Sequence, residues 1–121
     1  KANRSEVPAL LCLSTVSIFF IMPVYSKTAS SPTKLGEVLS MGIPVITNSG
    51  VGDVDEILSG TQCGTVIKEF DVANYQKAVL GIDALLQTPK SEMRSLATKH
   101  FSLKDGINAF DRVYSKIENR Q

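Results

Sequence analysis

A cluster of hydroxyl and basic side chains surrounds the start of an expected helix in the segment SSPTKLGEV. Ser30, Ser31 and Thr33 supply hydroxyl groups, and Lys34 supplies a cation. Ser31 is a natural N-cap, which would place Pro32 at the first helical position, where its missing N–H costs nothing. The first N–H groups of a helix lack partners inside it, and the helix dipole is positive at that end. Together these features favour binding of an anion, and of a phosphate group in particular.

A second loop, NSGVGD, contains two glycines, Gly50 and Gly52, that would let the backbone approach a ligand closely. The alternative interpretation is structural. In that case the serines and Asp53 act only as helix caps, and the glycines act only as turn residues. The residues themselves leave both interpretations open.

Strands alternate with helices along the chain and position these loops. The apolar, β-branched and aromatic run at 16–22 predicts a strand that is covered on both faces. PVIT at 44–47 and GTVI at 64–67 predict two further strands. A short helix is expected in PALLCL before the first strand. A second helix is expected at 32–41, followed by Gly42 and Pro44, which prevent its continuation.

The second half of the chain is expected to be mainly helical. Asp53 and Glu56 have the form of a capping box, so a helix should begin near Val54. Three more helices follow the third strand, and the second of them is short, at about 91–98. The first carries its apolar residues on one face, at Tyr75, Val79, Ile82 and Leu86. The third, which Ser102 and Asp105 could cap, has an apolar face of Leu103, Ile107, Phe110, Tyr114 and Ile117.

Alternating strands and helices predict an α/β fold, with a Rossmann-like parallel sheet and flanking helices. In such sheets, ligands bind beyond the carboxyl ends of the strands. The loops PVYSKTASSP and NSGVGD both leave those ends and run into helix N-termini. The pattern therefore predicts an anionic, phosphorylated ligand at these strand ends, with the loop of Gly50 and Gly52 as a possible second contact.

Composition excludes several other classes of protein. The chain has 121 residues and a net charge of +1, which suits one domain and gives no reason to expect a nucleic-acid partner. Cys12 and Cys63 are too few for a disulfide framework or a zinc site, and we expect both to be buried thiols. His100 has no other ligand at metal-binding spacing and is expected near a helix end. No metal site is predicted.

The segment 7–26 carries no charge and is long enough to span a bilayer. Pro8 and Pro23 lie near its ends, and its character changes from helix-like to β-branched halfway along. We therefore interpret it as a short helix followed by a strand of a soluble protein.

The segment SSPTKLGEVLSMGIPVITNSGVGDVDEIL, followed by GTVI, resembles the group 1, family 4 retaining glycosyltransferases. The similarity extends from about 6 to 117 and includes the closing segment FSLKDGINAFDRVYSKI. The resemblance implies a GT-B fold, in which two Rossmann-like domains face a cleft. Residues 1–121 would then be part of the C-terminal domain, which binds the nucleotide-sugar donor. The first βα units of that domain and the N-terminal acceptor domain would be absent.

The resemblance also implies roles for single residues. Glu37 matches the second Glu of the family's E-x7-E motif, which bonds the ribose of the nucleotide. Ala29 stands where the first Glu of the motif would be, so no catalytic role is carried over to this chain. The structural alternative for Glu37 is a solvated carboxylate paired with Lys34 at i, i+3, worth only about 0.2–0.5 kcal/mol.

The resemblance implies transfer of a sugar, with retention, from a nucleotide-sugar that is a substrate and not a cofactor. The acceptor would bind the missing N-terminal domain. The enzyme would be cytoplasmic, or at the membrane surface in its full-length form. The fragment alone would be inactive and would self-associate through the exposed edge of its first strand.

Three other interpretations compete with this one. A non-catalytic nucleotide or nucleotide-sugar binding module is compatible with the absent first Glu. A receiver-like signalling domain needs an Asp at a strand end, which is missing here. A hydrolase pair of Asp55 and Glu56 is disfavoured because sequence neighbours on a helix do not face each other.

Overall fold

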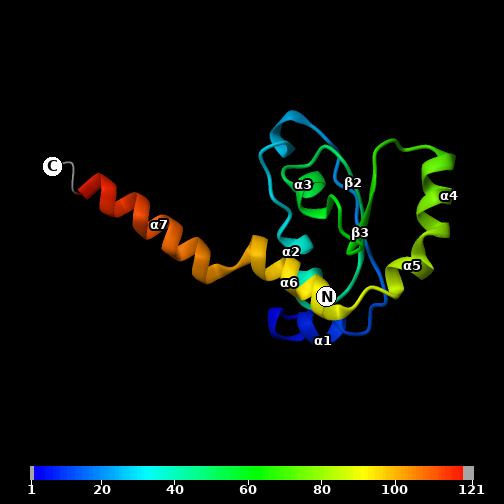
Figure 1. Cartoon of the computed structure of the whole chain (residues 1–121), viewed down its shortest axis with the longest axis horizontal. Helices are drawn as coiled ribbons and strands as arrows, with labels where there is room; N and C mark the ends of the chain where they lie inside the picture. The colour runs from blue at the N-terminus through cyan, green and yellow to red at the C-terminus, as the bar shows by residue number, and fades with distance from the viewer. Residues whose placement is uncertain (1, 119–121) are drawn as a thin grey trace.

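The computed structural model describes residues 2–118, which contain a three-stranded parallel sheet flanked by helices (Figure 1). The strands are β1 (Ser17–Ile18), β2 (Val45–Asn48) and β3 (Gly64–Ile67), in the order β1-β2-β3. Both neighbouring pairs are parallel, with Ile46 of β2 opposite Ile18 and Thr65. The predicted α/β class with a parallel sheet is therefore confirmed.

Helices cover both faces of the sheet. The α-helices are α1 (Val7–Leu11), α2 (Thr33–Ser40), α3 (Val54–Leu58), α4 (Val72–Leu80), α5 (Ile82–Leu86), α6 (Lys90–Phe101) and α7 (Leu103–Glu118). Two 3-10 turns, η1 (Arg4–Glu6) and η2 (Tyr25–Lys27), precede α1 and follow β1. No helix among residues 2–118 has the length and apolar character required to cross a membrane.

Strand β2 is the centre of the structure, and all four of its residues are buried. Its side chains alternate between two apolar clusters, as expected for a strand with helices on both sides. Val45 packs into the larger cluster with side chains of α2, α3 and α6. Ile46 packs into the smaller one with Ala78 of α4 and Leu85 of α5.

The prediction of a fully buried strand at 16–22 is wrong. Only Ser17 and Ile18 form the strand, and Ile18 and Phe20 are 59% and 46% exposed. On this face only Val16 packs against the smaller cluster, so Ile18 and Phe20 lack a covering layer. Phe19 and Ile21, on the other side, pack against the larger cluster. Self-association through this open edge stays a prediction.

Helix α2 begins one residue later than predicted, and the predicted N-cap is wrong. Pro32, with φ −70° and ψ 110°, is the N-cap, and no side chain caps the helix. Leu35 N–H donates to the Pro32 carbonyl at 2.9 Å, which shifts the first turn by one residue. The helix ends at Ser40, one residue before the predicted end, and Gly42, with a φ of +71°, follows its C-cap residue Met41. Gly42 N–H donates to Leu39, and Ile43 N–H donates to Val38, which together form a Schellman motif.

The single helix predicted through Tyr75 and Leu86 is two helices, α4 and α5, separated at Gly81. The predicted apolar face is right only at Ile82, which packs against the smaller cluster. Tyr75, Val79 and Leu86 are exposed, whereas the core side chains are Ala78 and Leu85. The aromatic ring of Tyr75 instead packs on the surface beside Phe20 and Phe70, with ring centres 6.5 Å from each.

The helix caps, His100 and the two cysteines agree with the predictions only in part. Helix α3 begins at Val54 as expected, but the Asp53 side chain makes no capping hydrogen bond. Ser102 accepts from Asp105 N–H at 3.2 Å and so caps α7. His100 lies in the last turn of α6, as expected. Cys63 is buried, but Cys12 is exposed because it follows α1 at the surface.

Gly36 lets α2 and α6 pack closely, because a Cβ there would lie 2.7 Å from the Phe101 ring. We predict that Gly36→Ala lowers the free energy of unfolding by about 1–3 kcal/mol, as for other overpacked sites. Gly106→Ala is the control, since nothing lies within 4 Å of the added Cβ and the site is inside α7. That change should raise stability by about 0.5–1 kcal/mol. Urea denaturation of both variants tests the difference, and equal stabilities would contradict the packing argument.

Candidate functional site

The two predicted loops meet beyond the carboxyl ends of β1 and β2. Gly52 N–H donates to the Lys27 carbonyl at 3.0 Å, and this bond joins the second loop to the first. Gly52 has a φ of +50°, and a Cβ there would collide with the Ser30 carbonyl oxygen. The glycine is therefore required for the two backbones to lie this close together.

The buried side chain of Asn48 anchors the first loop to the end of β2. Its Oδ1 accepts from Ile21 N–H at 2.7 Å, and its Nδ2 donates to the Ile21 carbonyl at 2.8 Å. Nδ2 also donates to the Ser49 carbonyl at 2.9 Å. The amide thus pairs with the main chain of Ile21 as a neighbouring strand residue would. Sequence reasoning missed this role, although a polar residue at the end of a buried strand is the signal that points to it.

The predicted phosphate-binding residues are brought together. Ser30, Ser31, Thr33 and Lys34 line a cavity of about 260 Å³ at the start of α2. Lys27, which sequence reasoning did not select, adds a second cation to this cavity. The remaining lining residues are Phe19, Phe20, Ile21, Pro32 and Val51. We call this the α2 cavity.

The electrostatics of the α2 cavity favour an anion. Thr33 and Lys34 are the first two residues of α2, and N–H groups at these positions have no acceptor within the helix. Two lysines line the cavity, and none of its lining residues is a carboxylate. The arrangement offers hydroxyls, unpaired amides and positive charge to one bound group.

Glu37 lies outside the α2 cavity. It lines a second cavity of about 460 Å³ between α1 and α2, together with Arg4, Val7, Pro8, Leu11, Ser40 and Met41. Thr33 and Glu37 are four residues apart, so they share one face of the helix. At 1.5 Å per residue, they are about 6 Å apart along its axis. An elongated ligand along this face would span both cavities.

The glycine loop is held by contacts within the protein. Gly50 N–H donates to the Asp55 carboxylate at 3.0 Å, and Gly52 N–H is used by Lys27. The close approach that these glycines permit is therefore between the two loops. Asp55 closes the glycine loop, a role that sequence reasoning did not assign to it.

Carboxylates occur in a third cavity, of about 320 Å³, next to the α2 cavity. Ala29, Asp53 and Glu56 line it, together with Thr28, Ser30, Ser31 and Gly52. Ser30 and Ser31 belong to both cavities. Asp53 and Glu56, at the start of α3, therefore bring carboxylates to the cavity that Ala29 lines without one.

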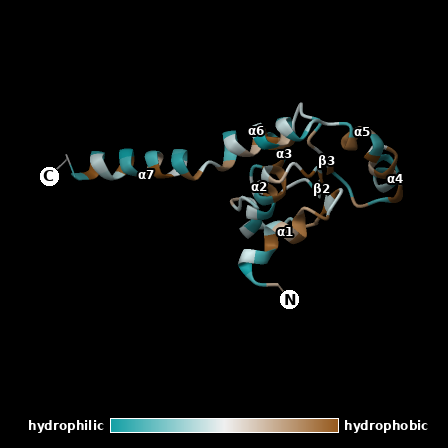
Figure 2. Cartoon of the chain, turned by 90° about the horizontal axis from the view of Figure 1, so that it is seen from below, coloured by the Kyte–Doolittle hydropathy of each residue, from teal (hydrophilic) through white to brown (hydrophobic). Residues whose placement is uncertain are grey.

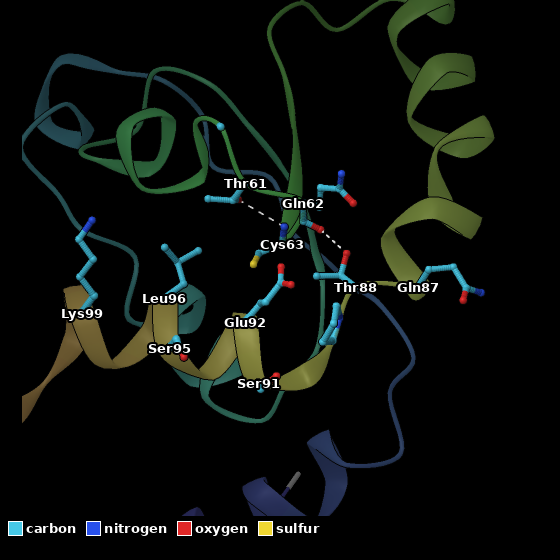
Figure 3. Close-up of a pocket in the computed structure, with 12 residues that line it drawn as sticks. Thr61, Gln62, Cys63, Gln87, Thr88, Ser91, Glu92, Ser95, Leu96 and Lys99 are labelled. Carbon is cyan, nitrogen blue, oxygen red and sulfur yellow. Dashed lines mark hydrogen bonds between the residues drawn. The ribbon is translucent and has the colours of Figure 1, made fainter.

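A further cavity, of about 650 Å³, lies elsewhere, beside the residues that precede β3 (Figure 3). Thr88 Oγ1 donates to the Gln62 carbonyl at 2.7 Å and joins its two walls. Burial raises the pKa of the Cys63 thiol, a hydrogen bond with Thr61 opposes this shift, and the charge of Glu92 adds to it. The thiol therefore stays protonated at neutral pH and is not an activated nucleophile.

No protein-family model and no curated protein matches the chain. Among residues 2–118, no group of three or more His, Cys, Asp or Glu side chains is placed to hold a metal ion. The function must therefore be argued from the site.

Asn48→Ala should lower the free energy of unfolding by about 2–4 kcal/mol, because each partly buried group left unpaired at Ile21 costs about 1–3 kcal/mol. Asn108→Ala on exposed α7 is the control, and it should leave stability unchanged or raise it by up to about 0.7 kcal/mol. Chemical denaturation measures both. Similar stabilities of the two variants would show that the Asn48 amide is not an anchor.

Gly52→Ala and Gly60→Ala form a matched pair for the loop contact. Both glycines have positive φ, but a Cβ at Gly60 would meet nothing within 4 Å. Each substitution should lower the free energy of unfolding by about 1–2 kcal/mol, because alanine adopts a positive φ unfavourably. Gly52→Ala should lose about 1–3 kcal/mol more because of its collision with Ser30. Thermal melts compare the two, and a Gly52→Ala protein as stable as Gly60→Ala would disprove the close contact.

Proposed function

We propose that this chain forms part of the nucleotide-sugar site of a GT-B retaining glycosyltransferase. The α2 cavity is the observation that carries the proposal. Hydroxyls, two lysines and the start of α2 converge at the carboxyl edge of a parallel sheet, which is where such folds bind nucleotides. The resemblance of 30–67 to the family supplies the class of ligand.

The donor diphosphate occupies the α2 cavity in this proposal. Ser30, Ser31 and Thr33 donate hydrogen bonds to it, and the Lys27 and Lys34 ammonium groups balance its charge. In glycosyl transfer the nucleoside diphosphate is the leaving group, so negative charge grows on it as the sugar–oxygen bond breaks. Positive groups placed before the reaction stabilise that charge and lower the barrier.

Glu37 binds the ribose of the same nucleotide. Its position about 6 Å along α2 from Thr33 suits a ribose attached to the diphosphate. A carboxylate has two acceptor oxygens and can therefore bond both ribose hydroxyls. The nucleotide would lie along the exposed face of α2, with its base beyond Glu37 near α1.

A non-catalytic nucleotide-binding module is the second candidate, and Ala29 is the observation that favours it. Asp53 and Glu56 line the cavity beside Ala29, so a carboxylate still lies near the diphosphate. Glu56→Gln in the full-length protein distinguishes the two. In an enzyme that uses this carboxylate, sugar transfer should fall at least tenfold while nucleotide affinity stays the same. If neither the wild type nor Glu56→Gln transfers sugar, the binding module is favoured.

Lys34→Ala should weaken nucleoside diphosphate binding about ten- to a hundredfold, since a charge-assisted hydrogen bond contributes about 1.5–3 kcal/mol. Lys77→Ala, on α4, is the control and should leave the affinity unchanged. Titration calorimetry on the full-length protein measures the dissociation constants. Equal affinities for wild type and Lys34→Ala would place the phosphates elsewhere.

Glu37→Ala should weaken binding of nucleotide and of nucleotide-sugar alike, by roughly ten- to a hundredfold, because the lost contact is to their shared ribose. Glu37→Gln should have a smaller effect, and Glu118→Ala on α7 should have none. If only the affinity for the nucleotide-sugar falls, Glu37 contacts the sugar and not the ribose. Unchanged affinity in calorimetry would make it a surface carboxylate.

A further inference from the structure

Helix α7 carries a continuous apolar stripe that no other described part of the chain covers. It projects away from the sheet in both views (Figures 1 and 2), and none of its residues is buried. The apolar side chains are each more than half exposed: Leu103, Ile107, Phe110, Val113, Tyr114 and Ile117. A stripe of this length is unusual on the surface of a monomer and indicates an interface.

The spacing of the stripe identifies the kind of interface. Leu103, Ile107, Phe110, Tyr114 and Ile117 are separated by four, three, four and three residues. This is the a/d pattern of a heptad, with Ile107 and Tyr114 at a, and the other three at d. Val113, at g, flanks these positions on one side. A seam of a and d positions fits the contact between two helices.

We propose that α7 pairs with α7 of a second copy of this chain, in an antiparallel coiled coil whose two-fold axis passes between Asn108 and Ala109. Leu103 of one copy then faces Tyr114 of the second copy, and Ile107 faces Phe110 of the second copy. Each ring therefore packs against an aliphatic side chain. A parallel pair would instead place Phe110 on Phe110 and Tyr114 on Tyr114.

The residues flanking the seam agree with the antiparallel register. Lys104 and Asp111 are both at e positions, and antiparallel helices bring e positions of the two copies together. Lys104 of each copy then faces Asp111 of the other copy. Gly106 and Val113 are both at g positions, and Val113 covers the space left by Gly106, where an added Cβ would meet nothing within 4 Å. In a parallel pair, Asp111 would face Gly106 and neither charge would gain a partner.

The shape of the molecule permits this pairing. The overlap from Leu103 to Tyr114 is about 18 Å long at 1.5 Å per residue. Because α7 extends outward from α6, an antiparallel pair places the two sheets at opposite ends of the coiled coil (Figure 1). Residues 115–118 of each copy extend past Leu103 of the other copy, so Ile117 lies beside the last turn of α6 and outside the α7 seam.

Light scattering coupled to size exclusion tests the pairing on the whole chain. The wild type should show the mass of a dimer at high concentration. Ile107→Glu should raise the dimer dissociation constant at least a hundredfold, whereas the neighbouring control Asn108→Glu, off the stripe, should leave it within about threefold. A wild type that is monomeric at every concentration overturns the proposal. So does a dimer that survives Ile107→Glu, which would instead point to the open edge of β1.

Two further variants test the antiparallel register. Lys104→Glu should weaken the dimer about threefold or more, and the double variant Lys104→Glu/Asp111→Lys should restore it. In a Cys12→Ser background, Gly106→Cys/Val113→Cys should cross-link two chains under mild copper–phenanthroline oxidation, and neither single variant should do so. Failure of the double cysteine variant to cross-link, or failure of the charge exchange to restore pairing, overturns this register.

Discussion

The hydrogen bonds between the Asn48 amide and the main chain of Ile21 determine how the carboxyl edge of the sheet is built. The backbone pairing of β1 with β2 stops after Ile46 accepts from Phe19 N–H. Beyond this point the Asn48 side chain replaces the missing strand partner, with bonds of 2.7 and 2.8 Å. The first loop therefore leaves the sheet in a fixed direction and can return to α2. Without this anchor, an edge strand only two residues long would not position a loop of this length.

The contact between the loops then places the charged groups. Gly52 lies against Ser30 and bonds to Lys27, so the hydroxyl-rich segment is held at the start of α2. The α2 cavity gathers the positive groups, and the adjoining cavity beside Ala29 gathers two carboxylates. This separation of charge suits a ligand with a phosphate portion on one side and a neutral, hydroxyl-bearing portion on the other.

The sequence predicted those parts of the fold that depend on local pattern. Both β2 and β3 were predicted because each is a short apolar run between turn signals. The bounds of β3 are those predicted, and β2 begins and ends one residue later than predicted. The buried strand at 16–22 was wrong because an apolar run does not reveal which strands lie beside it. Four residues that line the α2 cavity, Ser30, Ser31, Thr33 and Lys34, were singled out because a cluster of hydroxyls and a lysine before a helix is a local signal. Lys27 and the anchoring role of Asn48 were not, since both depend on how distant segments meet.

The most direct test of the central claim is an amide NMR titration of this chain with a nucleoside diphosphate. If the diphosphate binds at the start of α2, the amides of Thr33 and Lys34 should show the largest shift changes, with smaller changes near Glu37. Inorganic phosphate at higher concentration should shift the amide signals of Thr33 and Lys34 and leave the amide signal of Glu37 unchanged. Changes concentrated around Thr61, Cys63 and Glu92, at the cavity that precedes β3, would contradict the account.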